Sequence, residues 1–156
     1  MHDHEALLTR FYTAFRDRDG DAMAACYHPE ATFSDPVFPG LTGREPGAMW
    51  RMLTSRAEDL AIRFSDVKAD DTSGSAHWDA DYTFSTTGRF VRNSIDAKFT
   101  FRDGLILTHV DDFDFWKWSR QALGATGLLL GWTPIVRNKV REQAGSQLQK
   151  FLTKHG

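Results

Sequence analysis

The chain has 156 residues, of which 41% are hydrophobic and 13% are aromatic. This length suits one domain around a single hydrophobic core and is short for two. Cys26 is the only cysteine, which excludes an internal disulfide and a cluster of thiolate metal ligands. No apolar run approaches the roughly 18 residues of a membrane span, and the acidic N-terminal segment lacks the apolar core of a signal peptide, so we expect a cytoplasmic protein.

The net charge of -2 conceals an uneven distribution. Residues 1–116 carry 12 Lys and Arg against 20 Asp and Glu, whereas residues 117–156 carry seven against one. Residues 117–156 are therefore a basic extension of an acidic body. We expect this extension to dock on the body or on a partner subunit rather than on nucleic acid or an anionic membrane, because no aromatic residues interleave with a basic stripe.

The N-terminal segment has the spacing of an amphipathic helix over residues 4–18. Its apolar face comprises Leu7, Leu8, Phe11, Ala14 and Phe15. A short second helix is predicted to follow, with Asp21 as its N-cap, and to end near Pro29. Residues 31–35 then predict a brief strand, so Asp35 lies where this strand meets a loop rich in proline and glycine.

A third helix is predicted over residues 44–57, with Pro46 tolerated in its first turn. One side of it carries Trp50, Leu53 and Ala57. From residue 60 the pattern changes from helical to alternating. Four strands are expected, at residues 60–69, 76–86, 90–102 and 104–116. The short links between them favour an antiparallel meander.

Alternation gives each expected strand one inward face. The large apolar members of these faces include Trp78, Tyr82, Phe113 and Phe115. Asn93 is a polar exception in the third strand, and His109 and Asp111 share the inward face of the fourth. An unpaired ion is costly inside a core, so His109 and Asp111 should either satisfy each other or line a cavity.

Beyond residue 116 the chain returns to helical patterns. Residues 124–132, GATGLLLGW, are apolar and punctuated by glycine, which suits a lid across a pocket mouth or a subunit contact. Thr133 and Pro134 then open a last helix by an N-cap and a first-position proline. Its apolar stripe comprises Val136, Val140, Ala144, Leu148, Phe151 and Leu152. This stripe needs a partner, so we expect a homodimer; a basic helix lying on a membrane is the alternative for this element.

Several segments carry a family resemblance. They are HPEATFSDPV, SDPVFPGLTGRE, Phe99-x-Phe101, Asp103-Gly104 and His109-x-Asp111. They resemble the nuclear transport factor 2-like (NTF2-like) superfamily, in its SnoaL-like branch of polyketide cyclase-like and ketosteroid isomerase-like proteins. The resemblance implies an α+β, cystatin-like cone, in which N-terminal helices pack on a curved antiparallel β-sheet with an extra C-terminal helix. We expect one SnoaL-like domain over residues 1–156, with 117–156 as its basic helical extension, and dimerisation through the outer sheet face.

Comparison with the ketosteroid isomerases tests one activity. The segment Asp-Pro-Val that begins at Asp35 is similar to the segment that holds their general base. Their oxyanion hole uses a Tyr on the first helix and a protonated acid on a later strand. The aligned positions carry Phe11 and Ala97, while Tyr12 and Asp96 are each one residue away. Both donors are therefore missing at these positions, which disfavours steroid isomerisation.

The cyclase-like branch implies a different site. There a carboxylate, assisted by His or Asn, removes a proton from an activated carbon without metal or cofactor. This points to Asp111 as the base, with His109 and Asn93 as helpers and Asp35 as a second candidate. The residues expected to bind substrate are Phe11, Tyr12, Trp50, Trp78, Tyr82 and Phe113. An epoxide hydrolase is disfavoured, because no inward Arg is evident between two inward acids.

We therefore expect a cofactor-free acid-base enzyme of the isomerase, cyclase or dehydratase type, acting on a hydrophobic polycyclic or isoprenoid-like substrate. The alternative is a non-catalytic ligand-binding or protein-interaction domain. In that case Asp35 would only close an Asx-turn, and His109 and Asp111 would be a buried pair that fixes strand geometry. No metal site is expected, because His2-x-His4 lies at a terminus and His109-x-Asp111 lacks a third ligand.

Overall fold

The computed structural model describes residues 2–56 and 58–155. The helices are α1 (Asp3–Arg16), α2 (Gly20–Ala24), α3 (Glu45–Arg56), α4 (Phe115–Leu123), α5 (Ala125–Leu130) and α6 (Pro134–His155). The strands are β1 (Tyr27–Ser34), β2 (Leu41–Thr42), β3 (Ala61–Ala69), β4 (Ser73–Phe84), β5 (Arg89–Arg102) and β6 (Leu105–Asp112). Ala57, the predicted last residue of the third helix, lies outside the described residues.

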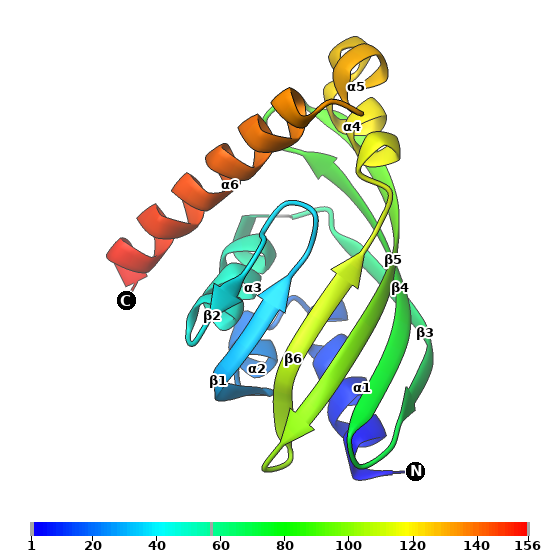
Figure 1. Ribbon diagram of the computed structural model, residues 1–156, viewed down its shortest axis with the longest axis vertical. Coiled ribbons are helices and arrows are strands. Elements are labelled where there is room, and N and C mark those ends of the chain that lie inside the picture. Colours follow the sequence, from blue (N-terminus) through cyan, green and yellow to red (C-terminus); the bar gives the residue numbers. More distant parts are fainter. Residues whose placement is uncertain (1, 57, 156) are drawn as a thin grey trace.

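The strands form one sheet in the order β2-β1-β6-β5-β4-β3. Neighbouring strands are antiparallel except β1 and β6, which run parallel. Figure 1 shows the sheet strongly curved, with α1, α2 and α3 on one side and α6 running from α5 back toward α3. The predicted α+β fold, with helices on a curved and mostly antiparallel sheet and an extra C-terminal helix, is confirmed.

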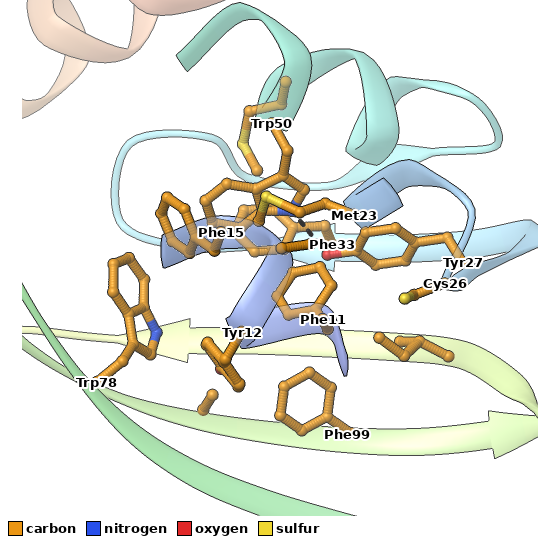
Figure 2. Close-up of a cluster of buried hydrophobic side chains, with 14 of the residues drawn as sticks. Phe11, Tyr12, Phe15, Met23, Cys26, Tyr27, Phe33, Trp50, Trp78 and Phe99 are labelled. Atoms are coloured by element: carbon orange, nitrogen blue, oxygen red, sulfur yellow. Dashed lines mark hydrogen bonds between the residues drawn. The ribbon is translucent and has the colours of Figure 1, made fainter. Parts of the chain in front are cut away.

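The apolar face of α1 anchors the sheet to α3. Its buried residues are Leu7, Leu8, Phe11, Tyr12, Ala14 and Phe15. Figure 2 shows Phe15 between Trp50 of α3 and Trp78 of β4, with ring centroids 4.9 Å and 5.1 Å away respectively. Burial of one such large apolar side chain contributes roughly 1.5–3 kcal/mol. The helical face predicted from spacing is therefore the one that holds the two layers together.

The second helix is shorter than predicted and has a different cap. Asp19 Oδ1 accepts a hydrogen bond from Ala22 N at 3.0 Å, so Asp19 rather than Asp21 is the N-cap, and α2 begins at Gly20. Asp21 Oδ1 instead accepts from Arg51 Nε at 2.8 Å, which ties α2 to α3. Either aspartate has the chemistry of a cap; the contact with α3 determines which one caps.

The first strand begins earlier than predicted. β1 starts at Tyr27 and includes Pro29, although proline cannot donate a hydrogen bond to a neighbouring strand. The pairing of β1 with β6 shifts register between Tyr27 and Thr32, and this irregularity accommodates the proline. The two-residue strand β2, which pairs antiparallel with β1, lies in a segment predicted to be a loop.

The last strand is shorter than predicted. β6 ends at Asp112, whereas the alternating pattern continued to Trp116. Asp114 Oδ1 accepts a hydrogen bond from Lys117 N at 3.0 Å and caps α4, so Phe115 and Trp116 are helical. A capping aspartate stabilises a helix by typically about 1 kcal/mol. The strand predicted for Phe115 is therefore wrong, although its side chain is buried as expected.

The apolar stripe of α6 packs against the core of the same chain. Leu148 of α6 is fully buried in the core that α1 and α3 share, and Ala144, Phe151 and Leu152 pack against that core. Arg141 Nε also donates to the carbonyl oxygen of Pro36 at 2.8 Å. The stripe therefore does not need a partner subunit, contrary to the prediction. None of the described helices combines the length and the apolar character needed to cross a bilayer.

Leu148→Ala should lower the free energy of unfolding by about 2–5 kcal/mol, because it leaves a cavity in this core. Leu129→Ala, at an exposed position of α5, is the matched control and should change it by less than about 0.5 kcal/mol. Urea unfolding of the three proteins measures both values. Equal effects of the two substitutions would contradict the docking of α6 on its own body.

Candidate functional site

A cavity of about 290 Å³ lies between the inner face of β4, β5 and β6 and the helices α3, α4 and α6. Four of the six residues expected to bind substrate line it: Trp50, Trp78, Tyr82 and Phe113. Phe11 and Tyr12 are instead buried in the layer between α1 and the sheet and are not part of the lining (Figure 2). The polar lining residues include Asp35, Asn93 and Asp111, all of which the sequence nominated.

One wall of the cavity is formed by α6, through Val140, Gln143, Ala144 and Gln147. The segment predicted to be a lid, residues 124–132, contributes none of the lining residues, although Leu123 just before it does. The helix that follows therefore covers the cavity. The lid alternative for residues 124–132 is therefore wrong, because a glycine-rich apolar sequence does not specify the surface it packs on, whereas a subunit contact stays a prediction.

His109 and Asp111 meet as expected. They point to the same face of β6, with residue exposures of only 1% and 3%, and His109 Nε2 lies 2.8 Å from Asp111 Oδ1. On the other side of the imidazole, Nδ1 lies 2.7 Å from the hydroxyl oxygen of Tyr27. That oxygen accepts a hydrogen bond from Trp50 Nε1 at 2.7 Å, which Figure 2 marks. A continuous hydrogen-bond chain thus runs from Trp50 through Tyr27 and His109 to Asp111.

The direction of this hydrogen-bond chain follows from donor and acceptor chemistry. An indole N–H can only donate, so the Tyr27 oxygen accepts from Trp50 and its own hydrogen is directed to His109 Nδ1. Burial raises the pKa of Tyr27 well above its usual value, which keeps this hydrogen in place. The imidazole proton then lies on Nε2 and is donated to Asp111 Oδ1.

The two oxygens of Asp111 differ. Oδ1 accepts from His109 and also lies 3.5 Å from the indole nitrogen of Trp78. Oδ2 is buried and has no hydrogen-bond partner within residues 2–56 and 58–155. Buried polar atoms are nearly always paired, so an unpaired one beside a cavity marks a place for a ligand or a water molecule. The protein orients one oxygen of Asp111 and leaves the other, which is also buried, without a partner in the described residues.

Asp35 is the second carboxyl group of the cavity. Its Oδ1 accepts from the backbone N–H groups of Val37 and Phe38 at 2.7 Å and 2.6 Å, which is the Asx-turn geometry foreseen as its structural role. Burial nevertheless raises its pKa to about 7, and the charge of Asp111 acts in the same direction. The two backbone N–H groups and Arg141 oppose this rise. Asp35 therefore closes a turn and also titrates near neutral pH.

Tyr82 contributes a hydroxyl group as well as an aromatic ring. Trp118 Nε1 donates to its oxygen at 2.8 Å, so the hydroxyl hydrogen of Tyr82 is available for another acceptor. Burial raises the pKa of Tyr82, and the charge of Asp35 adds to the effect. Asn93 of β5 also lines the cavity, opposite Ala80 in the sheet register. Sequence alternation placed Tyr82 and Asn93 on the inner face, but it did not reveal that the Tyr82 hydroxyl is available as a hydrogen-bond donor.

Residues 8–109 match the model of the SnoaL-like domain. This chain belongs to the SnoaL-like family. The match covers more than half of the chain and ends within β6, two residues before Asp111. The SnoaL-like family and the NTF2-like fold predicted from sequence segments are therefore confirmed.

Solved structures share the SnoaL-like fold at low sequence identity. An NTF2-like protein from Burkholderia pseudomallei is 15% identical, with a TM-score of 0.67 over 78% of this chain and 98% of that one. TerC, co-crystallised with polyporic acid, is 15% identical, with a TM-score of 0.66 over 79% and 100%. An epoxide hydrolase of the LEH-like type from Mycobacterium tuberculosis is 18% identical, with a TM-score of 0.63 over 81% and 92%. No curated protein matches the sequence significantly.

Tyr27→Phe should destabilise this SnoaL-like protein by about 1–3 kcal/mol, because it leaves Trp50 Nε1 and His109 Nδ1 buried without a partner. Tyr12→Phe is the matched control: its hydroxyl is buried and has no partner among the described residues, so its removal should be neutral or slightly stabilising. Chemical unfolding compares the two. A similar loss in both variants would contradict the role assigned to Tyr27.

Proposed function

We propose that this SnoaL-like protein transfers a proton at a carbon atom next to a carbonyl group, in a hydrophobic ring compound bound in the cavity. The asymmetry of Asp111 carries the proposal. Its Oδ1 is held by the hydrogen-bond chain, whereas its Oδ2 is buried and has no partner in the described part of the molecule, and Asp111 is one of the residues that line the apolar cavity. A carboxylate that is oriented through one oxygen and has no hydrogen-bond partner at the other suits a general base, once a small shift of the side chain or of its neighbours brings that oxygen to the ligand.

In the proposed reaction, Asp111 Oδ2 takes a proton from the substrate carbon, and the electron pair of the C–H bond moves to the carbonyl oxygen as an enolate. Donation from His109 Nε2 stabilises the Asp111 carboxylate before this step. In an isomerisation, the proton returns to another carbon. In a cyclisation, the enolate carbon attacks a second carbonyl group, and Asp111 returns the proton to the alkoxide that forms. No further reactant is needed in either case.

The developing enolate needs hydrogen-bond donors. The hydroxyl hydrogen of Tyr82 is available, and with a pKa of about 7 Asp35 carries a proton in a large share of molecules at neutral pH. Both groups line the cavity that Asp111 faces. Donors aimed at the site of developing charge are usually the largest catalytic term. Tyr82 and protonated Asp35 thus supply the two oxyanion-hole donors that Phe11 and Ala97 cannot provide. Asn93 is a further donor.

The cavity limits the size of the substrate. Its volume of about 290 Å³ is at the lower end of ordinary ligand sites. It is roughly twice the ~150 Å³ of an apolar cavity that accepts benzene, which suits a molecule of two or three rings or an isoprenoid of similar size. Its walls are mostly aromatic and aliphatic, so shape and apolar contact would select the ligand, while the few polar groups would orient one carbonyl.

The contacts of Arg141 argue against epoxide hydrolysis by an Asp-Arg-Asp arrangement. Arg141 Nε donates to the carbonyl oxygen of Pro36, and the partner of Asp111 is a histidine rather than an arginine.

The homodimer through the outer sheet face stays a prediction. Val110, an exposed apolar residue on that face, is the place where sedimentation of a Val110→Lys variant would test it.

Hydrogen exchange tests the proposed function even while the product is unidentified. Ring ketones of two or three rings are screened for binding by the rise they cause in melting temperature. Each ligand that binds is then incubated with the protein in deuterated water, and NMR follows the loss of its carbon-bound hydrogens next to the carbonyl. Exchange that is faster with protein than without supports proton transfer. Binding without exchange for every ligand would support a non-catalytic ligand-binding domain instead.

A further inference from the structure

The end of the molecule at α5 presents apolar side chains to solvent. Figure 1 shows α5 projecting at one end of the molecule, away from α1, α2 and α3. The exposed residues are Leu128 (53%), Leu129 (68%), Leu130 (50%), Trp132 (71%) and Ile135 (78%). We call residues 128–135 the α5 tip. Contiguous apolar patches of this kind on soluble proteins mark sites of contact with a protein or a membrane.

The outward position of the leucines follows from the glycines around them. The inner face of α5 carries Gly127, and Gly131 follows the helix; a Cβ atom at either position would collide with Ser119 of α4. Only a face without side chains allows this close approach between α4 and α5. The large side chains of the segment are therefore directed away from the body.

The segment that contains the α5 tip carries only positive charges. Residues 117–141 contain no Asp or Glu, and Lys117, Arg137 and Lys139 are exposed in this stretch. Arg89 of β5 adds a further positive charge, because its Nε donates to the carbonyl oxygen of Gln121 in α4 at 2.8 Å. The apolar tip is thus set in a basic end of the molecule, while the body is acidic.

We propose that the α5 tip docks the protein on an anionic lipid surface. The leucines and Ile135 would enter the boundary between headgroups and acyl chains, Trp132 would lie at headgroup level, and the flanking lysines and arginines would meet lipid phosphates and carboxylates. A second copy of the chain is a poorer occupant of the same surface. A symmetric contact between two tips would bring two basic ends together, at a cost in electrostatic repulsion.

The cavity reaches the same end of the molecule. Leu123, which precedes the joint between α4 and α5, lines the cavity together with Thr86 of the turn between β4 and β5. The neighbouring Thr87 donates through its hydroxyl group to the carbonyl oxygen of Ala122, which fixes that turn against α4. A hydrophobic ligand dissolved in the bilayer would therefore lie close to this edge of the cavity. The docking itself does not depend on the proposed chemistry.

Flotation of the full-length protein with vesicles tests the docking. Vesicles of phosphatidylcholine alone are compared with vesicles that also contain phosphatidylserine, at low and at high salt. We expect binding to the anionic vesicles only, weaker at high salt. Lys117→Gln and Lys139→Gln should each weaken it about fivefold, and the double variant Leu129→Ser, Trp132→Ser should weaken it at least about tenfold.

Val110→Ser is the apolar control and Lys98→Gln is the charge control, since both positions are exposed on the outer sheet face. Both should bind as the wild type does, and unfolding curves of all variants confirm that they are folded. A blue shift of tryptophan emission on vesicles, lost in Trp132→Phe, provides a second measurement. Equal binding to neutral and anionic vesicles, or no effect of the tip substitutions, would overturn the proposal. A dimer that the tip substitutions dissociate, in a protein that does not bind vesicles, would overturn it in favour of a second copy.

Discussion

Asp111→Asn should slow the exchange of carbon-bound hydrogens in a bound ligand by a factor of about 10² to 10⁴, while the ligand still raises the melting temperature. The amide oxygen at this position can still accept the hydrogen bond from His109 Nε2, so the wall of the cavity keeps its shape. An amide cannot take a proton from carbon, however. NMR exchange rates and melting curves measure the two effects separately.

The matched control is Asp112→Asn. Asp112 is the next residue of β6, and it is exposed on the opposite face of the sheet. This variant should exchange the ligand hydrogens and bind the ligand as the wild type does. Wild-type exchange in Asp111→Asn would show that another group is the base. A loss of binding as large as the loss of exchange would make Asp111 a binding residue.

Asp35→Asn should make the protein more stable, and the gain should grow with pH. The pKa of Asp35 is raised from 3.8 to about 7 in the folded protein, first by burial. Between these values the folded protein keeps a proton that the unfolded chain has released, so the free energy of unfolding falls as the pH rises through this window. At about 1.4 kcal/mol per pKa unit, the cost approaches about 4 kcal/mol above pH 7. Asparagine does not titrate and removes this cost.

Urea unfolding at pH 5 and pH 8 measures the effect. The gain from Asp35→Asn should be larger at pH 8 than at pH 5 by about 2–3 kcal/mol, because most of the titration lies between these values. The amide oxygen can still accept from the N–H groups of Val37 and Phe38, so the turn is preserved. Asp112→Asn, which removes an exposed carboxylate of β6, is the matched control. A gain that is equal at both pH values would mean that proton release by Asp35 does not limit stability.

Alternation along a strand was enough to place the central pair of the site. His109 and Asp111 lie two residues apart, so a strand directs both side chains to the same face, and the structure joins them at 2.8 Å. The rest of the hydrogen-bond chain was not predictable in this way. Tyr27 lies 82 residues before His109 in the sequence, and the parallel pairing of β1 with β6 brings them together. No local pattern encodes such a pairing.

Residue type alone could not separate core from cavity. Phe11 and Trp50 were both expected to bind substrate, and both are buried aromatic residues close to His109, with ring centroids 5.7 Å and 6.2 Å away. Only Trp50 reaches the cavity. Helical spacing defines the face on which a side chain lies, but the depth of that face depends on what packs against it. The same limit applies to α6, whose stripe was predicted but whose partner was not.

The walls of the cavity come from two parts of the chain. Asp35, Trp50 and Asn93 lie within residues 8–109, which match the family model, whereas the wall residues of α4 and α6 lie beyond it. The hydrogen-bond chain behind Asp111 is built by α3, β1 and β6 and makes no use of the C-terminal helices. A different C-terminal segment on the same body would reshape the space offered to a ligand and leave the hydrogen bonds from Trp50 to Asp111 in place. Under the proposed function, ligand selectivity would then vary with the C-terminal segment, while the body sets the orientation of the base.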